Sequence, residues 1–437
     1  MLSLRKKAEE FLKKYGMNPA DVDLDRNCDI FVREMQNGLD GSGSLLMIPT
    51  YIGIEKELPV NEPIIAVDAG GTNFRVAVVH FDENRKPVIE DFKLYPMPGT
   101  KGEISKEEFF ETMADYIQPV IDRSNKISFS FSYAAETMPD RDGKIIFFSK
   151  EVRIRNIKGE LLGRNLLDVF KKRGVDKEIE FIALNDTVAT LLAGKAASPD
   201  RIFDSYIGFI LGTGTNICYA ERSSNIVKVP ELKDRDGLML INMETGSYNK
   251  EPRSKLDIDF DSTTVNPGEC TYEKTISGAY QGGLALTVIR RAAEDGLLTP
   301  DFAAEFRNVK ELVAKELDDF LFYPYGDNVL ARCCAKSDSD VDRRILYYLI
   351  DAVFERIAKF VVFSLAAVIE KTGRGTDPCR PVCITADGST FYKSKLFRSK
   401  LDHYVKTYMN EARELYCEFV KVDNGTLIGT AIAGLIN

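Results

Sequence analysis

Residues 64–81 read IIAVDAGGTNFRVAVVHF, and this stretch decides the fold class of the chain. An apolar, β-rich run ends at Asp68, the chain turns at Gly70 and Gly71, and a second apolar run continues to Phe81. Two short apolar runs joined by a glycine turn are typical of a β-hairpin. We therefore expect two antiparallel strands here, with the glycines between them.

The turn of this hairpin has the composition of a phosphate-binding loop. Glycine has no Cβ, so the chain can adopt positive φ and its N–H groups can approach an anion closely. The expected donors around the turn are Gly70, Gly71, Thr72, Asn73 and Arg75. Asp68, at the strand end, can accompany the magnesium ion of a nucleotide. Taken alone, the stretch fits an ordinary turn without a ligand equally well.

Length and charge limit the possible functions. A chain of 437 residues suits two domains with a cleft between them, or one large α/β unit. The formal net charge of −9 argues against broad binding to nucleic acid or to an anionic membrane. His80 and His403 are the only histidines, which excludes a histidine-rich metal site. We expect the chemistry to depend on carboxylates, hydroxyls and lysines.

The sequence predicts a cytoplasmic protein with no membrane partner. Residues 1–11 lack the apolar core of a secretory signal, and the longest apolar stretch, Phe360–Ile369, is too short to span a bilayer. The eight cysteines lack the paired spacing of a metal site. We expect them to be free thiols in a reducing compartment.

Strand and helix patterns alternate through the first half of the chain. Val88–Tyr95 alternates polar and apolar residues, as a third strand with one wet face would. Ser105 is the expected N-cap of the helix that follows. The other expected strands are Lys126–Phe131, Lys144–Ser149 and Ile179–Leu184, and the expected helices are Leu2–Tyr15, Cys28–Leu39, Ser105–Ile121 and Leu161–Arg173.

A second cycle repeats the opening hairpin in kind. After an expected helix over Thr187–Ala197, a strand over Ser205–Leu211 enters the turn Gly212–Gly214, and Asn216–Glu221 leaves it as a strand. Two such hairpins facing each other across a cleft would hold a polyphosphate. The remaining expected elements are strands at Gly237–Met243, Pro381–Ala386 and Glu418–Val422, helices at Cys270–Arg291, Phe302–Phe320, Val341–Lys371 and Ser394–Leu415, and a short final helix.

Eight stretches, taken together, resemble the hexokinase family in identity, order and spacing. They are DAGGTNFRV (68–76), SFSFSY (128–133), Ser149 with Lys150, IALNDTVAT (182–190), GTGTNICYAE (212–221), NMETG (242–246), NPGECTYEK (266–274) and DGS (387–389). The resemblance implies an α/β fold: a two-domain, actin-like (ribonuclease-H-like) sugar kinase with an interdomain cleft. It places residues 50–185 and 430–437 in a small domain and residues 1–49 and 186–429 in a large one.

The resemblance also implies an activity, namely the ATP-dependent phosphorylation of a hexose at its 6-hydroxyl, with glucose as the expected hexose. Asp186 would be the general base, assisted by Lys150, and Mg²⁺ would accompany ATP with Asp68 and Asp186 in its outer coordination shell. The implied sugar contacts are Ser130, Ser149, Lys150, Asn185, Asp186, Asn216, Glu244 and Glu273. The implied ATP contacts are Asp68, Gly70, Gly71, Thr72, Asn73, Arg75, Gly212, Thr213, Gly214, Gly388, Ser389, Gly425 and Thr426.

Several of these residues also have an ordinary structural interpretation. Asp186 can be the N-cap of the helix over Thr187–Ala197. Lys150 can be a solvated charge at a strand end. Glu273 lies in the first turns of a helix, where negative charge is favourable in any protein.

The chain departs from the usual pattern of the family at five positions near the sugar contacts. They are Thr245 in place of Trp, Cys270 in place of Gln, Glu151 in place of Gly, Ser132 in place of Pro, and Gly283 in place of Glu. These changes bear on the identity and affinity of the sugar more than on phosphoryl transfer. Two alternatives therefore stay open: a catalytically weak sugar sensor, and an actin-like ATPase without sugar kinase activity. We expect a monomer or a homodimer.

Overall fold

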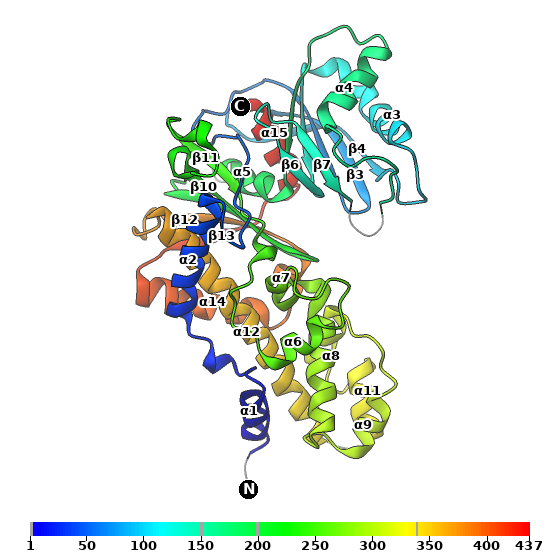
Figure 1. Ribbon diagram of the computed structural model, residues 1–437, viewed down its shortest axis with the longest axis vertical. Helices are drawn as coiled ribbons and strands as arrows, with labels where there is room; N and C mark the ends of the chain where they lie inside the picture. The colour runs from blue at the N-terminus through cyan, green and yellow to red at the C-terminus, as the bar shows by residue number, and fades with distance from the viewer. Residues whose placement is uncertain (1–2, 149–151, 198–200, 338–339) are drawn as a thin grey trace.

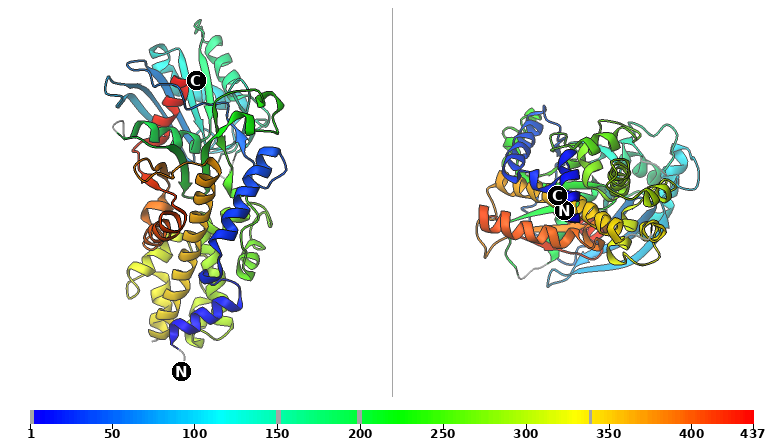
Figure 2. Two further views of the ribbon diagram at one scale, coloured as in Figure 1. Left: turned by 90° about the vertical axis from the view of Figure 1, so that its left-hand side faces the viewer. Right: turned by 90° about the horizontal axis from the view of Figure 1, so that it is seen from below.

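Two sheets with the same strand order organise the molecule. The computed structural model describes residues 3–148, 152–197, 201–337 and 340–437. The molecule is elongated, and its two termini lie at opposite ends (Figure 1). One sheet with its helices forms one end, the second sheet lies in the middle, and helices form the other end (Figure 2).

The first sheet contains the predicted hairpin. Its strand order is β4-β3-β2-β5-β8. β2 and β3 are antiparallel with Asp68 opposite Arg75, which confirms the hairpin, while β5 and β8 continue the sheet in parallel. The strands are β2 (Ile64–Gly70), β3 (Asn73–Phe81), β4 (Pro87–Pro96), β5 (Lys126–Phe131) and β8 (Glu180–Leu184).

Two helices and a small ribbon complete this end of the molecule. α3 (Lys106–Ile117) and α4 (Leu162–Lys172) bury Phe109 and Leu166 in one core with Phe129 of β5. The predicted N-cap is confirmed, because the Ser105 hydroxyl accepts a hydrogen bond from the N–H of Glu108. A separate ribbon pairs β6 (Ala134–Thr137) with β7 (Gly143–Phe147), and the sequence pattern had indicated only the second of these strands.

The second sheet repeats the arrangement of the first. Its order is β1-β11-β10-β9-β12-β13, in which β9, β10 and β11 are antiparallel and β12 and β13 run parallel to β9. The repeat of the hairpin is the one that the two glycine turns predicted. The strands are β1 (Ile48–Pro49), β9 (Ser205–Leu211), β10 (Thr215–Arg222), β11 (Leu238–Asn242), β12 (Val382–Asp387) and β13 (Cys417–Val420).

Two helices cross between the sheets. α5 (Asp186–Ala197) follows β8 of the first sheet but packs on β9 and β12 of the second. α15 (Gly425–Ile436) follows β13 of the second sheet but packs on β2 and β5 of the first, and it also packs against α5. An ideal Cβ at Gly429 of α15 would lie 1.7 Å from the carbonyl oxygen of Ala189 in α5. The two backbones therefore touch at this glycine. The predicted domain boundary at residue 430 falls within α15 and stays a prediction.

Helices make up the far end of the molecule around the long helix α12 (Figure 1). The apolar stretch Phe360–Ile369 is buried in the middle of α12, as predicted. The helices are α1 (Leu4–Lys14), α2 (Leu24–Asp40), α6 (Lys255–Asp261), α7 (Thr271–Ile276), α8 (Gly278–Glu294), α9 (Pro300–Phe306), α10 (Ala314–Phe322), α11 (Val329–Lys336), α12 (Asp340–Thr372), α13 (Ser389–Lys393) and α14 (Phe397–Tyr404). In the described ranges, no helix is both long and apolar enough to cross a membrane.

Three predicted helices are interrupted. The expected helix over Cys270–Arg291 breaks at Ser277, which is extended (φ −81°, ψ 155°) and separates α7 from α8. The helix expected over Phe302–Phe320 is split into α9 and α10, and the carbonyl of Leu312 in the intervening loop lies against Gly282 of α8. α14 widens into a π-helical segment over residues 405–412. Tertiary contacts rather than local sequence set the first two breaks.

The contact at Gly429 predicts a stability effect. Gly429→Ala should destabilise the protein by about 3 kcal/mol, because the new methyl group would overlap the Ala189 carbonyl and the two helices would have to separate. Gly425→Ala on the same helix is the matched control, since its nearest neighbour would be a Val422 side-chain atom at 3.4 Å. Chemical denaturation of the three proteins measures the difference. Equal stability of both variants would contradict the close contact.

Candidate active site

The β2–β3 turn is held from both sides. Asp68 is buried and pairs with Arg75, with an Nη1–Oδ2 distance of 2.6 Å. Gly71 has a φ of +56°, a conformation that glycine adopts without strain. An ideal Cβ at Gly70 would lie 2.9 Å from the hydroxyl of Ser132, which directly follows β5. A side chain at position 70 would therefore collide with Ser132. The Tyr133 hydroxyl donates to the Gly71 carbonyl at 2.6 Å and fixes the turn.

Asp186 lies at the junction of the two sheets as the first residue of α5. Asn185, not Asp186, caps this helix, because its Oδ1 accepts a hydrogen bond from the N–H of Thr187 at 2.9 Å. The N-cap interpretation of Asp186 was therefore wrong, and its carboxylate is not committed to the helix end. Burial, as the largest cause, and the charges of Asp68 and Glu244 raise the pKa of Asp186, the hydroxyls of Ser132 and Thr187 oppose this rise, and the resulting pKa is about 6.

Carboxylates from both sheets converge around Asp186. Burial raises the pKa of Asp68, the Arg75 guanidinium lowers it, and the charge of Asp387, at the end of β12, raises it. The same kind of interaction links Asp186 to Asp68 and Glu244. The hairpin, Asp186 and DGS motifs are thus linked electrostatically through Asp68. That they line one cleft stays a prediction.

The second glycine turn is fixed by the start of α8. The carbonyl of Gly212 accepts hydrogen bonds from the N–H of Gly278 at 2.8 Å and from the Thr390 hydroxyl at 3.1 Å, and the carbonyl of Thr213 accepts one from the N–H of Ala279 at 3.2 Å. The first N–H groups of a helix lack intrahelical partners, so the break at Ser277 lets them bind the turn instead.

The DGS turn touches the second glycine turn. An ideal Cβ at Gly212 would lie 3.4 Å from the Cα of Gly388. A Cβ at Gly388 itself would lie 2.2 Å from the carbonyl oxygen of Leu211, at a φ of +115° that only glycine adopts readily. Two of the predicted ATP-binding segments therefore form one continuous surface. Gly425 and Thr426 begin α15, and a Cβ at Gly425 would face Val422 and Ala193 instead.

A chain of amides orients the predicted sugar-binding glutamates. Asn216 donates from Nδ2 to Oδ1 of Asn242 at 2.7 Å, and Asn242 donates from Nδ2 to Oε1 of Glu244 at 2.8 Å. Oε2 of Glu273 accepts the N–H of Thr215 at 3.1 Å. Burial raises the pKa of Glu244, and the charge of Glu273 raises it further. The structure thus brings together three of the predicted sugar contacts.

Two other departures from the usual pattern lie beside these glutamates. Thr245 is fully buried, and its hydroxyl accepts the N–H of Ile217 at 3.0 Å. Cys270 is exposed at the start of α7 with a φ of 48°. Burial of its thiol raises the pKa of Cys270, and the charge of Glu273 raises it further. Thr245 is therefore part of the packing beneath the predicted sugar contacts, whereas Cys270 reaches the surface.

The remaining predicted sugar contacts differ in what the structure shows. Ser130 is fully buried, and its hydroxyl has no hydrogen-bond partner within the part of the chain that the structure describes. Such a group is available to a ligand. Ser149, Lys150 and the departure Glu151 lie outside the described residues. The sequence did not indicate the link that Asn242 makes between Asn216 and Glu244, and it marked Ser132 only as a departure from the family pattern, not as a partner of Asp186.

Comparison with known proteins places the chain in a family. Two sequence models, both described as hexokinase, match residues 7–196 and residues 206–436. The chain belongs to the hexokinase family. Hexokinase-1 of Spinacia oleracea is 28% identical over 94% of this chain and 89% of its own length, and Hexokinase-5 of Oryza sativa subsp. japonica is 29% identical over 92% and 84%.

The fold of this hexokinase agrees with solved structures. A hexokinase from Schistosoma mansoni, complexed with glucose, has a TM-score of 0.75 at 22% identity and covers 99% of this chain and 100% of that chain. The chain therefore has the actin-like, two-domain sugar kinase fold that the motifs predicted. As a member of this family it is a phosphotransferase that uses ATP to phosphorylate a hexose.

The amide chain at the sugar side of this hexokinase gives a prediction. Asn242→Ala removes the donor to Glu244 and the acceptor of Asn216, so hexose affinity should fall about tenfold, as for the loss of one hydrogen bond to a charged group. Isothermal titration calorimetry with glucose measures this affinity. Asn225→Ala is the control, because Asn225 makes a comparable 2.8 Å bond to Glu221. Unchanged affinity in Asn242→Ala would show that the amide chain does not orient Glu244.

Proposed function

We propose that Asp186 is the general base that activates the 6-hydroxyl of glucose for attack on the γ-phosphorus of ATP. The observation that carries this proposal is the position of Asp186 between Asp68 of the phosphate hairpin and Glu244 of the sugar side. A carboxylate with a pKa of about 6 is ionised at neutral pH yet basic enough to accept a proton as the oxygen attacks.

The sugar would be bound through its ring hydroxyls. Carboxylates and amides can each hold two neighbouring hydroxyls, and Asn216, Glu244 and Glu273 offer such groups. Ser130 contributes a buried hydroxyl, and Asn185, beside Asp186, a side-chain amide. We propose Ser149 and Lys150 as further contacts, with Lys150 assisting catalysis. Closure of the two lobes around the sugar would exclude water and limit hydrolysis of ATP.

The two glycine turns are suited to the phosphates of ATP. We propose that the β2–β3 turn binds through Gly70, Gly71, Thr72, Asn73 and Arg75, and that the second turn binds through Gly212, Thr213 and Gly214. Since Arg75 already pairs with Asp68 at 2.6 Å, one guanidinium bridges the hairpin carboxylate and the site of the nucleotide. Gly388, Ser389, Gly425 and Thr426 would line the adenosine.

The carboxylates near these turns fit Mg²⁺ as the companion of ATP. Oxygen ligands suit this ion, which usually retains several water molecules. Over the described ranges, no group of three or more His, Cys, Asp or Glu side chains is arranged to hold a metal directly. We therefore propose that Asp68 and Asp186 contact the ion through water. When bound, the ion neutralises charge on the phosphates.

Product analysis tests the proposed substrate. Purified protein with magnesium ATP should form ADP and sugar 6-phosphate with glucose, and mannose and fructose serve as competing hexoses. ADP formed equally without sugar would favour an ATPase. Sugar-dependent thermal stabilisation without turnover would favour a sensor, the alternative raised by Thr245 and Cys270.

We further propose a cytoplasmic monomer or homodimer.

The base assignment predicts a selective loss of turnover. Asp186→Ala should retain hexose binding and lose roughly 10²- to 10⁴-fold in kcat. In the wild-type enzyme, kcat/KM should fall below about pH 6, because protonation of Asp186 removes the acceptor. Initial rates over pH 5 to 8, with calorimetric sugar binding, measure both effects. Near-normal turnover in Asp186→Ala would refute the assignment.

A further inference from the structure

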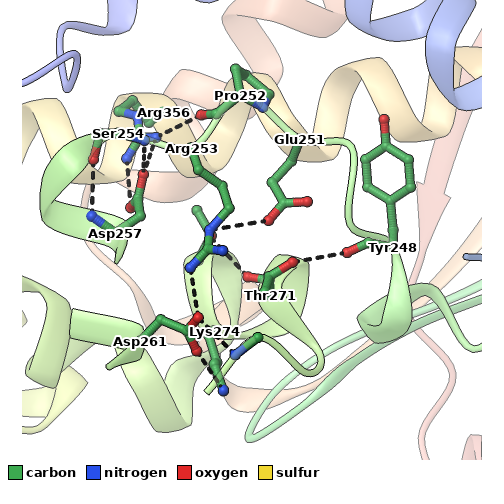
Figure 3. A network of polar contacts seen from close by, with 12 residues as sticks. Tyr248, Glu251, Pro252, Arg253, Ser254, Asp257, Asp261, Thr271, Lys274 and Arg356 are labelled. Carbon is green, nitrogen blue, oxygen red and sulfur yellow. Dashed lines mark hydrogen bonds and ion pairs between the residues drawn. The ribbon is translucent and has the colours of Figure 1, made fainter. Parts of the chain in front are cut away.

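A buried carboxylate lies behind the predicted sugar contacts. The Glu251 side chain is 0% exposed, and neither oxygen has a hydrogen-bond partner in the described structure. Its nearest cation is Arg253, whose Nε lies 3.9 Å from Oε1. That guanidinium makes its shorter contact, 2.7 Å, with Asp261 (Figure 3). Among the described residues, Glu251 is therefore a buried acid with one ion-pair partner, which lies 3.9 Å away and is shared with Asp261.

The groups that face Glu251 do not neutralise it. They are Arg253 on the same loop, Asp257 of α6, Tyr248 beside η5 (Thr245–Ser247), and Tyr272 of α7. Asp257 is already paired with Arg356 of α12 at 2.8 Å. Burial is the largest cause that raises the pKa of Glu251, the charge of Asp257 adds to the rise and that of Arg253 opposes it, and the resulting pKa is about 7. A buried carboxyl without a hydrogen-bond partner in the described part of the chain thus favours its neutral form.

Glu251 lies where two sugar-site segments meet. The Tyr248 carbonyl accepts hydrogen bonds from the Thr271 hydroxyl at 3.4 Å and from the N–H of Tyr272 at 3.3 Å, which joins the loop after Glu244 to α7 (Figure 3). α7 carries Glu273, and the loop begins at Glu244. The position of both glutamates thus depends on a junction that contains Glu251.

We propose that Glu251 is a positioning residue whose protonation holds this junction closed and so sets the affinity for the hexose. In the neutral form the carboxyl remains buried. In the ionised form it must acquire water, because a buried charge that, within the described ranges, lacks hydrogen bonds and shares its one distant cation with Asp261 is costly. Hydration of Glu251 loosens the contact between the loop and α7 and displaces Glu244 and Glu273. This inference depends on the proposed role of these two glutamates in binding the sugar.

The test compares Glu251→Gln with the wild type and with Glu269→Gln. Glu269 is exposed and precedes α7, so its substitution removes a nearby carboxylate without changing the buried junction. Calorimetric binding of glucose at pH 6 and pH 8 should show wild-type affinity falling roughly threefold or more at the higher pH. This change is smaller than the tenfold change in affinity that a shift of about one pKa unit would cause. Glu251→Gln should keep the affinity of pH 6 at both values, and Glu269→Gln should follow the wild type. KM should change in parallel, with kcat much less affected.

Two results would overturn the proposal. One is a wild-type affinity that is constant from pH 6 to 8, which needs no variant to observe. The other is a pH dependence that persists unchanged in Glu251→Gln. Failure of every protein to bind glucose at any pH would instead refute the sugar site itself, and this inference with it.

Thermal unfolding without sugar provides a second, independent measurement. The pKa of Glu251 in the folded protein, about 7, lies above its ordinary value of 4.5, so the folded state binds the proton more tightly than the unfolded state. Wild-type stability should therefore decrease relative to Glu251→Gln as the pH rises from 6 to 8. Parallel melting temperatures over this range would show that Glu251 does not titrate in the folded protein.

Discussion

The structure depends on holding several carboxylates close together at the junction of the two lobes. Asp68 comes from the first sheet, Asp186 from the helix that crosses to the second, and Glu244 from the second sheet's edge. Burial and mutual repulsion favour their neutral forms, and Arg75 and the amide of Asn242 are what oppose this effect most directly. Such a group of carboxylates favours ligands that bring hydrogen-bond donors or positive charge, which is the chemistry that the proposed sugar and the proposed magnesium ion would supply.

The rigid parts of the molecule serve to place this junction. Gly429 lets α15 contact α5 directly, and α5 presents Asp186 at its first residue. The start of α8 binds the carbonyls of the second glycine turn. Both the α15–α5 contact and the contact between α8 and the second glycine turn use backbone groups rather than long side chains. Positions fixed by backbone contacts vary little, which suits a reaction that requires aligned atoms.

The sequence predicted those features that are encoded locally. Both hairpins and the long helix α12 follow from apolar periodicity and glycine turns, whereas the common strand order of the two sheets is seen only in the structure. The break at Ser277 has no comparable signal, because it is stabilised by the carbonyls of Gly212 and Thr213, which are distant in sequence. The role of Asn185 as a cap and of Asn242 as a link also depends on partners brought together by folding. The burial of Glu251 has no signal in the sequence, because the groups around it come from its own loop, from α6 and from α7.

The equal order of five strands in the two sheets makes α5 and α15 topological counterparts. Each follows the last strand of its sheet, and the helix starts read Asn185-Asp186-Thr187 and Asn424-Gly425-Thr426. At equivalent places, one copy carries a carboxylate and the other carries no side chain. The same kind of helix start thus presents a charged side chain at one place and a close packing contact at the other, where a Cβ at Gly425 would face Val422 and Ala193.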